Sequence, residues 1–128
     1  MRRAFALPEE DVAHLDSLGL PWETVIDGGN QWLLLERFPF PAGYNVREGS
    51  VAIQIPAGYS TAPLDMAYFL PHLSRADGGQ IRQAQVQVTI ENRGWQRWSR
   101  HYPWVAGEHN IGTHLTLVSR WLEAALQS

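Results

Sequence analysis

The chain has 128 residues, of which 45 % are hydrophobic, and this size and composition predict one globular domain covering residues 1–128. Its formal net charge of −3 argues against a nucleic-acid partner, and its longest apolar runs are too short to span a membrane. It contains no cysteine, which excludes disulfides, thiolate metal sites and thioesters formed on its own side chains. The ten Lys and Arg residues are all arginine.

The N-terminal segment predicts a helix. Residues 1–7 include basic residues but no apolar stretch typical of a signal peptide, so we expect a cytoplasmic protein without a membrane anchor. Pro8 suits a first helical turn because its missing N–H would be unpaired there, and the acids at positions 9–11 complement the positive helix end. Gly19 is expected to end this helix.

Four segments of β character follow. The strands are expected at residues 22–27, 32–38, 51–55 and 64–70. Gly28, Gly29 and Asn30 form a turn signal between the first two strands, and Pro56 to Tyr59 turns the chain after the third. We expect this run of strands to form an antiparallel meander sheet.

The second half adds a hairpin and a final helix. Residues 75–80 read as a polar loop, and Val86, Val88 and Ile90 alternate on one face of a strand over residues 85–90. A turn at residues 91–94 returns the chain through residues 95–100, and a loop over 102–112 precedes an amphipathic helix from about 111 to 126. The predicted fold class is α+β, with an N-terminal helix, an antiparallel meander sheet and a C-terminal amphipathic helix.

One stretch resembles a known strand, turn and strand arrangement. Residues 51–69 are similar to the third strand, proline turn and fourth strand of ubiquitin-conjugating enzymes. Pro56, Tyr59 and Pro63 match that pattern, whereas Ser60 and Ala62 stand where the family has prolines.

Nearly the whole chain resembles a bacterial branch, prokaryotic family E of the ubiquitin-conjugating enzyme (UBC-like) superfamily. The matching blocks lie at residues 7–12, 18–24, 38–45, 95–101 and 113–122. This resemblance implies a UBC-like fold. It also implies partners that comprise a ubiquitin-like protein, often in several copies, an activating enzyme and a JAB-type peptidase.

The chain departs from this family where the chemistry is expected. Catalytic members carry a nucleophilic cysteine after the fourth strand, usually behind a His-Pro-Asn loop. Here that region is residues 70–81, in which Pro71 and His72 are followed by neither an asparagine nor a cysteine. We therefore expect a non-catalytic adaptor that binds a ubiquitin-like protein or an activating enzyme without a cofactor. A hairpin over residues 85–100 is expected to replace the catalytic segment.

The alternative is an enzyme that works without a thiol. His72, Ser74 and Asp77 are the candidate residues for a serine nucleophile with its base, although Ser74 also suits a turn cap and His72 a surface loop. His101, His109 and His114 are candidate metal ligands, but none of their spacings is the helical pair of a zincin.

Tryptophan and arginine gather in the last third of the chain. The candidates for a partner-binding surface are Trp95, Arg97, Trp98, Arg100 and Trp104, because Trp and Arg dominate interface hot spots. The other interpretation places Trp121 and one or two of these tryptophans in the core between the sheet and the last helix. A third alternative is a structural subunit of a larger complex, which would leave an apolar patch exposed.

Overall fold

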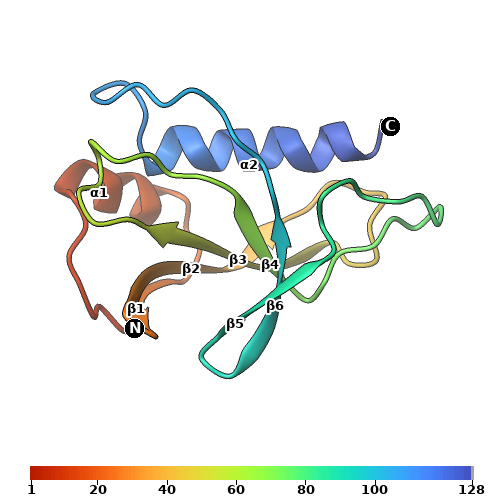
Figure 1. Ribbon diagram of the computed structural model, residues 1–128, viewed down its shortest axis with the longest axis horizontal. Helices are drawn as coiled ribbons and strands as arrows, with labels where there is room; N and C mark the ends of the chain where they lie inside the picture. The colour runs from red at the N-terminus through yellow and green to blue at the C-terminus, as the bar shows by residue number, and fades with distance from the viewer. Residues whose placement is uncertain (128) are drawn as a thin grey trace.

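Six antiparallel strands form one curled sheet with a helix at each end of the chain (Figure 1). The computed structural model describes residues 1–127. The elements are α1 (Glu9–Ser17), β1 (Trp22–Asp27), β2 (Asn30–Pro39), β3 (Glu48–Ile55), β4 (Ala67–Leu70), β5 (Val86–Ile90), β6 (Arg93–Trp98) and α2 (Ile111–Ala125). This arrangement confirms the predicted α+β class and is compatible with a UBC-like fold.

Both outer hairpins turn within two residues. Gly28 and Gly29 between β1 and β2 have φ angles of 58° and 81°, and Glu91 and Asn92 between β5 and β6 have φ angles of 50° and 65°. Two successive positive φ angles define the type I′ turn, whose twist matches that of the flanking strands. These turns fix the register of the hairpins at the two ends of the sheet.

The strand order is β1-β2-β3-β4-β6-β5, so only the first four strands form the predicted meander. The loop over residues 71–85 carries the chain past β4, and β6 rather than β5 then pairs with β4. Strand β5 is left at the edge, where Val86 is 45 % exposed while Ile90 is buried. Val86, Val88 and Ile90 alternate along β5 opposite Arg97, Trp95 and Arg93, as the predicted period of two requires, and exposure along this face is greatest at Val86.

Strand β4 is shorter than expected. The prediction placed it over residues 64–70, but the strand begins at Ala67. Met66 has a φ of 59°, which is incompatible with an extended strand. Asp65 accepts a hydrogen bond from the Met66 N–H at 3.1 Å and so supports this local turn.

The main core lies between one face of the sheet and the two helices, with α2 laid across the sheet (Figure 1). Leu115, Val118 and Leu122 recur at helical spacing and are buried against strand residues such as Phe69 and Trp98. The helix begins with a capping box, in which the Asn110 side chain accepts from the Thr113 N–H and Thr113 Oγ1 accepts from the Asn110 N–H. No helix within residues 1–127 has both the length and the apolar content needed to cross a bilayer.

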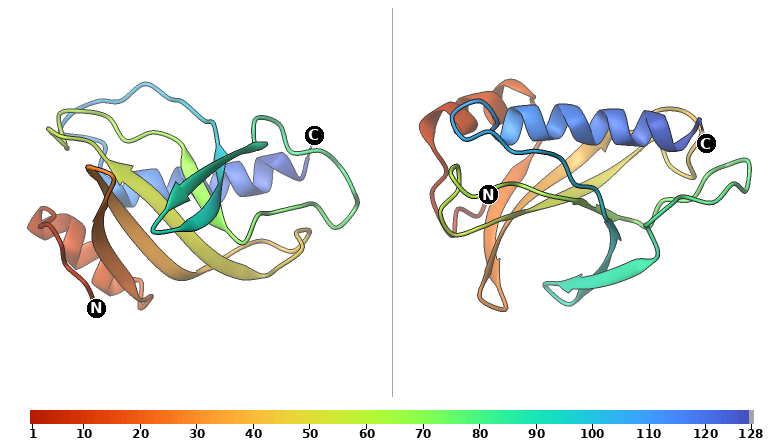
Figure 2. Two further views of the ribbon diagram at one scale, coloured as in Figure 1. Left: turned by 60° about the horizontal axis from the view of Figure 1, so that its bottom comes forward. Right: turned by 45° about the horizontal axis from the view of Figure 1, so that its top comes forward.

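A second, smaller core lies on the opposite face of the sheet. Its buried members are Val25, Trp32, Ala52, Tyr68, Ile90 and Trp95. The β1–β2 and β5–β6 hairpins both project away from α2 and lie side by side (Figure 2). Their tips are joined because the Glu91 N–H donates to Asp27 Oδ2 at 3.2 Å and Arg2 pairs with both Glu23 and Glu91. The sheet is thus partly closed on itself by its own hairpins.

Candidate functional site

The segment after β4 is fixed on the sheet by two side-chain amides. Asn45 Nδ2 donates to the His72 carbonyl at 3.1 Å, and Asn45 Oδ1 accepts from the Ser74 N–H at 2.8 Å. The buried Gln96 holds both backbone groups of Leu73, at 2.9 and 3.0 Å. Residues 72–74 therefore form an ordered surface rather than a loop free to close over a substrate.

This ordered segment does not assemble a serine active site. His72 Nε2 lies 3.2 Å from the Gly94 carbonyl, and the Asp77 carboxylate accepts from Arg75 Nη2 at 2.7 Å and from the Gly79 N–H at 2.8 Å. The Arg75 guanidinium lowers the pKa of Asp77. Within residues 1–127 no hydrogen bond connects Ser74 to His72 or His72 to Asp77. The structure thus places the candidate residues in separate contacts, since His72 lies against a backbone carbonyl and Asp77 pairs with an arginine.

The three C-terminal histidines also serve separate contacts. His101 Nδ1 pairs with the Asp65 carboxylate at 2.9 Å, whereas His109 Nδ1 accepts from the Val105 N–H at 2.8 Å. Across residues 1–127 there is no group of three or more His, Cys, Asp or Glu side chains that would hold a metal ion. His101, His109 and His114 therefore do not form the ligand set that the sequence offered as an alternative.

His114 is a fully buried, neutral connector. Its Nε2 lies 2.8 Å from the Met66 carbonyl, which can only accept, so Nε2 carries the proton. Its Nδ1 then accepts from the Tyr102 hydroxyl at 2.7 Å. Burial lowers the pKa of His114 to about 4. The imidazole thus ties α2 to the start of β4 and to the loop over residues 102–109.

A second buried connector joins the two helices. Asp11 on α1 is 2 % exposed and accepts from the Tyr59 hydroxyl at 2.8 Å, and the Tyr59 oxygen accepts from the Ile111 N–H at 2.8 Å. Burial raises the pKa of Asp11, while the Tyr59 hydrogen bond opposes that rise. The sequence marked Asp11 only as an acid of the first helical turn, and no local pattern shows that it faces the start of α2.

The predicted tryptophan surface is largely interior. Trp95 is 3 % exposed and Trp98 is fully buried, because β6 is covered on one face by α2 and on the other by the curled sheet. These two residues are therefore corrected from partner contacts to core. Arg97 and Arg100 stay half-buried, and the Arg100 guanidinium carbon lies 5.0 Å from the centre of the Trp98 ring. Arg97 opens onto a pocket that Asp65 and Tyr68 also line.

Trp104 is the predicted tryptophan that reaches the surface. Its ring packs against Tyr59 and Tyr102 at centroid distances of 6.2 and 6.1 Å, and its Nε1 donates to the Ser60 carbonyl at 2.9 Å. The neighbouring Val105 is 45 % exposed. The loop over residues 102–109 thus presents an anchored aromatic ring and an exposed aliphatic side chain beside the proline turn. We call this surface, made of Trp104 and Val105, the Trp104 loop.

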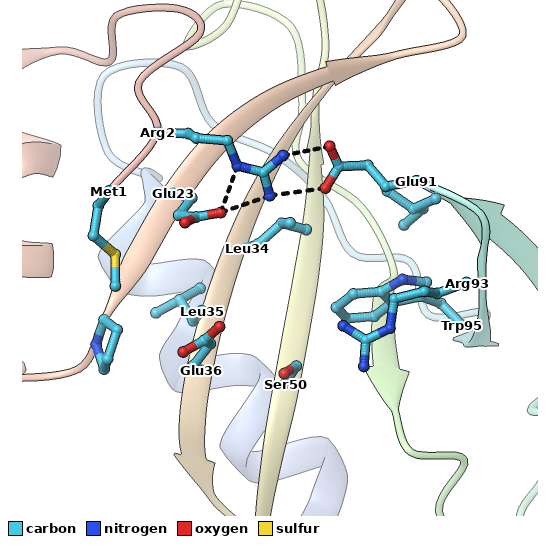
Figure 3. Close-up of a pocket in the computed structure, with 12 residues that line it drawn as sticks. Met1, Arg2, Glu23, Leu34, Leu35, Glu36, Ser50, Glu91, Arg93 and Trp95 are labelled. Atoms are coloured by element: carbon cyan, nitrogen blue, oxygen red, sulfur yellow. Dashed lines mark hydrogen bonds and ion pairs between the residues drawn. The ribbon is translucent and has the colours of Figure 1, made fainter.

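A small cavity opens between the two hairpins (Figure 3). Its volume is about 70 Å³, and Arg2 lies across it with hydrogen bonds to Glu23 and Glu91. Trp95, whose buried indole N–H has no hydrogen-bond partner among the described residues, forms part of its wall. This space holds a few water-sized groups and is too small for a peptide chain.

Comparison with known proteins identifies the scaffold. The family model described as prokaryotic E2 family E matches residues 7–125, a span that includes both helices and all six strands. No curated protein and no solved structure matches the chain.

Proposed function

Because the chain belongs to prokaryotic E2 family E, we propose that it is a non-catalytic E2-like protein of a bacterial ubiquitin-like conjugation system. It would bind a ubiquitin-like protein, or the activating enzyme of that system, as an adaptor in the cytoplasm. A JAB-type peptidase completes the proposed partner set. The observation that carries this proposal is a family match over residues 7–125 in a chain without a single cysteine.

The chemistry explains why recognition is the favoured role. A thioester needs a thiolate nucleophile, which serine replaces only when a base lies within hydrogen-bond reach. The Ser74 hydroxyl has no such base among the described residues, since His72 contacts the Gly94 carbonyl. The scaffold retains ordered surfaces on which a partner protein can dock.

The Trp104 loop is the proposed partner surface. Trp104 is held by three aromatic neighbours and by Ser60, so little side-chain freedom would be lost when a partner covers it. A rigid tryptophan next to exposed aliphatic area is typical of a binding hot spot. Arg97 remains a second candidate, in its pocket on the opposite face of the sheet from α2.

Isothermal titration with a ubiquitin-like protein from the same bacterium tests the proposal. We expect a dissociation constant of about 1–100 µM, and about a tenfold weaker constant for Trp104→Ala. Ile26→Ala is the matched control, because Ile26 is 53 % exposed on β1 and its truncation should leave affinity unchanged. Thermal melts verify that both variants fold. No heat of binding with either the ubiquitin-like protein or the activating enzyme would overturn the proposal.

A further inference from the structure

A groove lies beside the C-terminal half of α2. Its lining residues do not include Trp104 or Val105 of the Trp104 loop. Its volume is about 430 Å³. The lining residues are Arg82, Arg100, Trp121, Ala124 and Ala125. Two cations and an indole thus share one concave surface in a chain whose net charge is −3.

Arg100 is held in this groove by neutral backbone groups. Its Nη1 donates to the Arg82 and Ser99 carbonyls, each at 3.0 Å, and its guanidinium lies over the Trp98 ring. Arg82 is a charged neighbour of Arg100. Burial, together with this second cation, lowers the pKa of Arg100. The position of the guanidinium is therefore fixed before any anion arrives.

Within residues 1–127, neither Arg82 nor Arg100 is paired with a carboxylate. Among the ion pairs of residues 1–127, Arg2, Arg75 and His101 engage carboxylates, whereas Arg82 and Arg100 do not. A half-buried guanidinium beside another cation is unfavourable unless an anion neutralises the pair. The planar fork of arginine fits carboxylates in particular, because both oxygens can accept hydrogen bonds at once.

We propose that this groove binds an acidic peptide segment of a protein partner. Carboxylates of the segment accept hydrogen bonds from Arg82 and Arg100, while an apolar side chain packs against Trp121 and Ala124. A nucleic-acid strand fits less well, because the overall negative charge of the chain repels a polyanion and the groove offers apolar surface. The sequence pointed to Arg100, but Arg82 lies in a polar loop whose pattern carries no binding signal.

The test uses a short fluorescein-labelled peptide of alternating aspartate and glutamate with a terminal leucine and a free carboxyl end. Fluorescence anisotropy of the full chain is expected to show saturable binding, which weakens at least tenfold when the acids are replaced by asparagine and glutamine. Arg82→Glu should weaken binding at least tenfold as well, because Arg82 is exposed and its replacement neutralises the neighbouring Arg100. Arg93→Glu is the matched control, since Arg93 is an exposed arginine on the opposite face of the sheet.

Nuclear magnetic resonance locates the site independently. Peptide addition should shift the indole N–H signal of Trp121 and leave that of Trp32, which lies in the second core, unchanged. Equal weakening by Arg82→Glu and Arg93→Glu, equal binding of the amide peptide, or full competition by inorganic phosphate at the peptide's own concentration would each overturn the proposal. The assay contains no ubiquitin-like protein, so its outcome is separate from that of the proposed function.

Discussion

The buried contact between Asp11 and Tyr59 gives the sharpest test of how the helices are held together. Tyr59→Phe keeps the ring and removes only the hydroxyl, which donates to the Asp11 carboxylate and accepts from the Ile111 N–H. A hydrogen bond to a charged group contributes about 1.5–3 kcal/mol and a neutral one about 1 kcal/mol. We therefore expect a loss of about 2–4 kcal/mol in the free energy of unfolding at neutral pH. The melting temperature should fall by about 10 °C.

The pH dependence separates this contact from simple loss of packing. Burial raises the pKa of Asp11 above its ordinary value of 3.8, so the stability this group contributes is present at acid pH and lost as the pH rises through the folded-state pKa. The Tyr59 hydroxyl opposes that rise because it stabilises the ionised carboxylate. In Tyr59→Phe the pKa of Asp11 should be higher still. The stability difference between wild type and variant is therefore expected to grow as the pH rises from acid to neutral.

Urea denaturation of both proteins across this range measures the effect. Tyr68→Phe is the matched control, since among residues 1–127 the Tyr68 hydroxyl has a single hydrogen-bond partner, the Met66 sulfur at 3.8 Å. Its removal should change stability by less than about 1 kcal/mol. A loss for Tyr59→Phe that is the same at every pH, or no larger than that for Tyr68→Phe, would show that the Tyr59 hydroxyl does not stabilise an ionised Asp11.

Three further changes test other parts of the fold. In wild type, urea denaturation should show a fall of about 3 kcal/mol in the free energy of unfolding as the pH drops from 6.5 to about 4, because the depressed pKa of His114 favours the neutral ring in the folded state. His114→Asn should not show this fall, because asparagine does not titrate. A variant with the same pH profile as wild type would contradict this. Gly49→Ala should lower the free energy of unfolding by about 1–3 kcal/mol, since the added Cβ would lie 2.9 Å from the Leu70 carbonyl oxygen and 2.9 Å from the Phe40 ring. An unchanged chemical denaturation midpoint would show that these neighbours move aside for the methyl group at no cost in stability. Leu122→Ala should cost about 2–5 kcal/mol, because Leu122 is fully buried between α2 and the sheet; a thermal melt within the error of wild type would place the core elsewhere.

Local patterns were sufficient for the elements of the fold. Gly28 and Gly29 supply the positive φ angles of the first turn, Pro8 marks the start of α1, and the apolar repeat through Leu115 and Leu122 identifies the buried face of α2. Each of these signals depends on residues close in sequence, so the element can be predicted without knowledge of the tertiary structure.

The arrangement of those elements was harder to predict, because it depends on contacts distant in sequence. Alternation shows that β6 has two faces, but only the curl of the sheet and the position of α2 reveal that both faces are covered, which buries Trp95 and Trp98. The pairing of β6 with β4 likewise follows from the path of the loop over residues 71–85. The candidate surfaces changed for the same reason: Trp104 stayed accessible, and Arg82 joined Arg100 from a loop with no recognisable motif.

Whether the chain only binds its partner, or also carries it covalently, is decided by intact-mass spectrometry of the chain after incubation with the activating enzyme, ATP and the ubiquitin-like protein. We expect a non-covalent complex under native conditions and an unchanged mass for the chain after denaturation. A denatured chain that carries the ubiquitin-like protein through an ester stable to thiols but cleaved by hydroxide would contradict it, and would revive the alternative of serine chemistry.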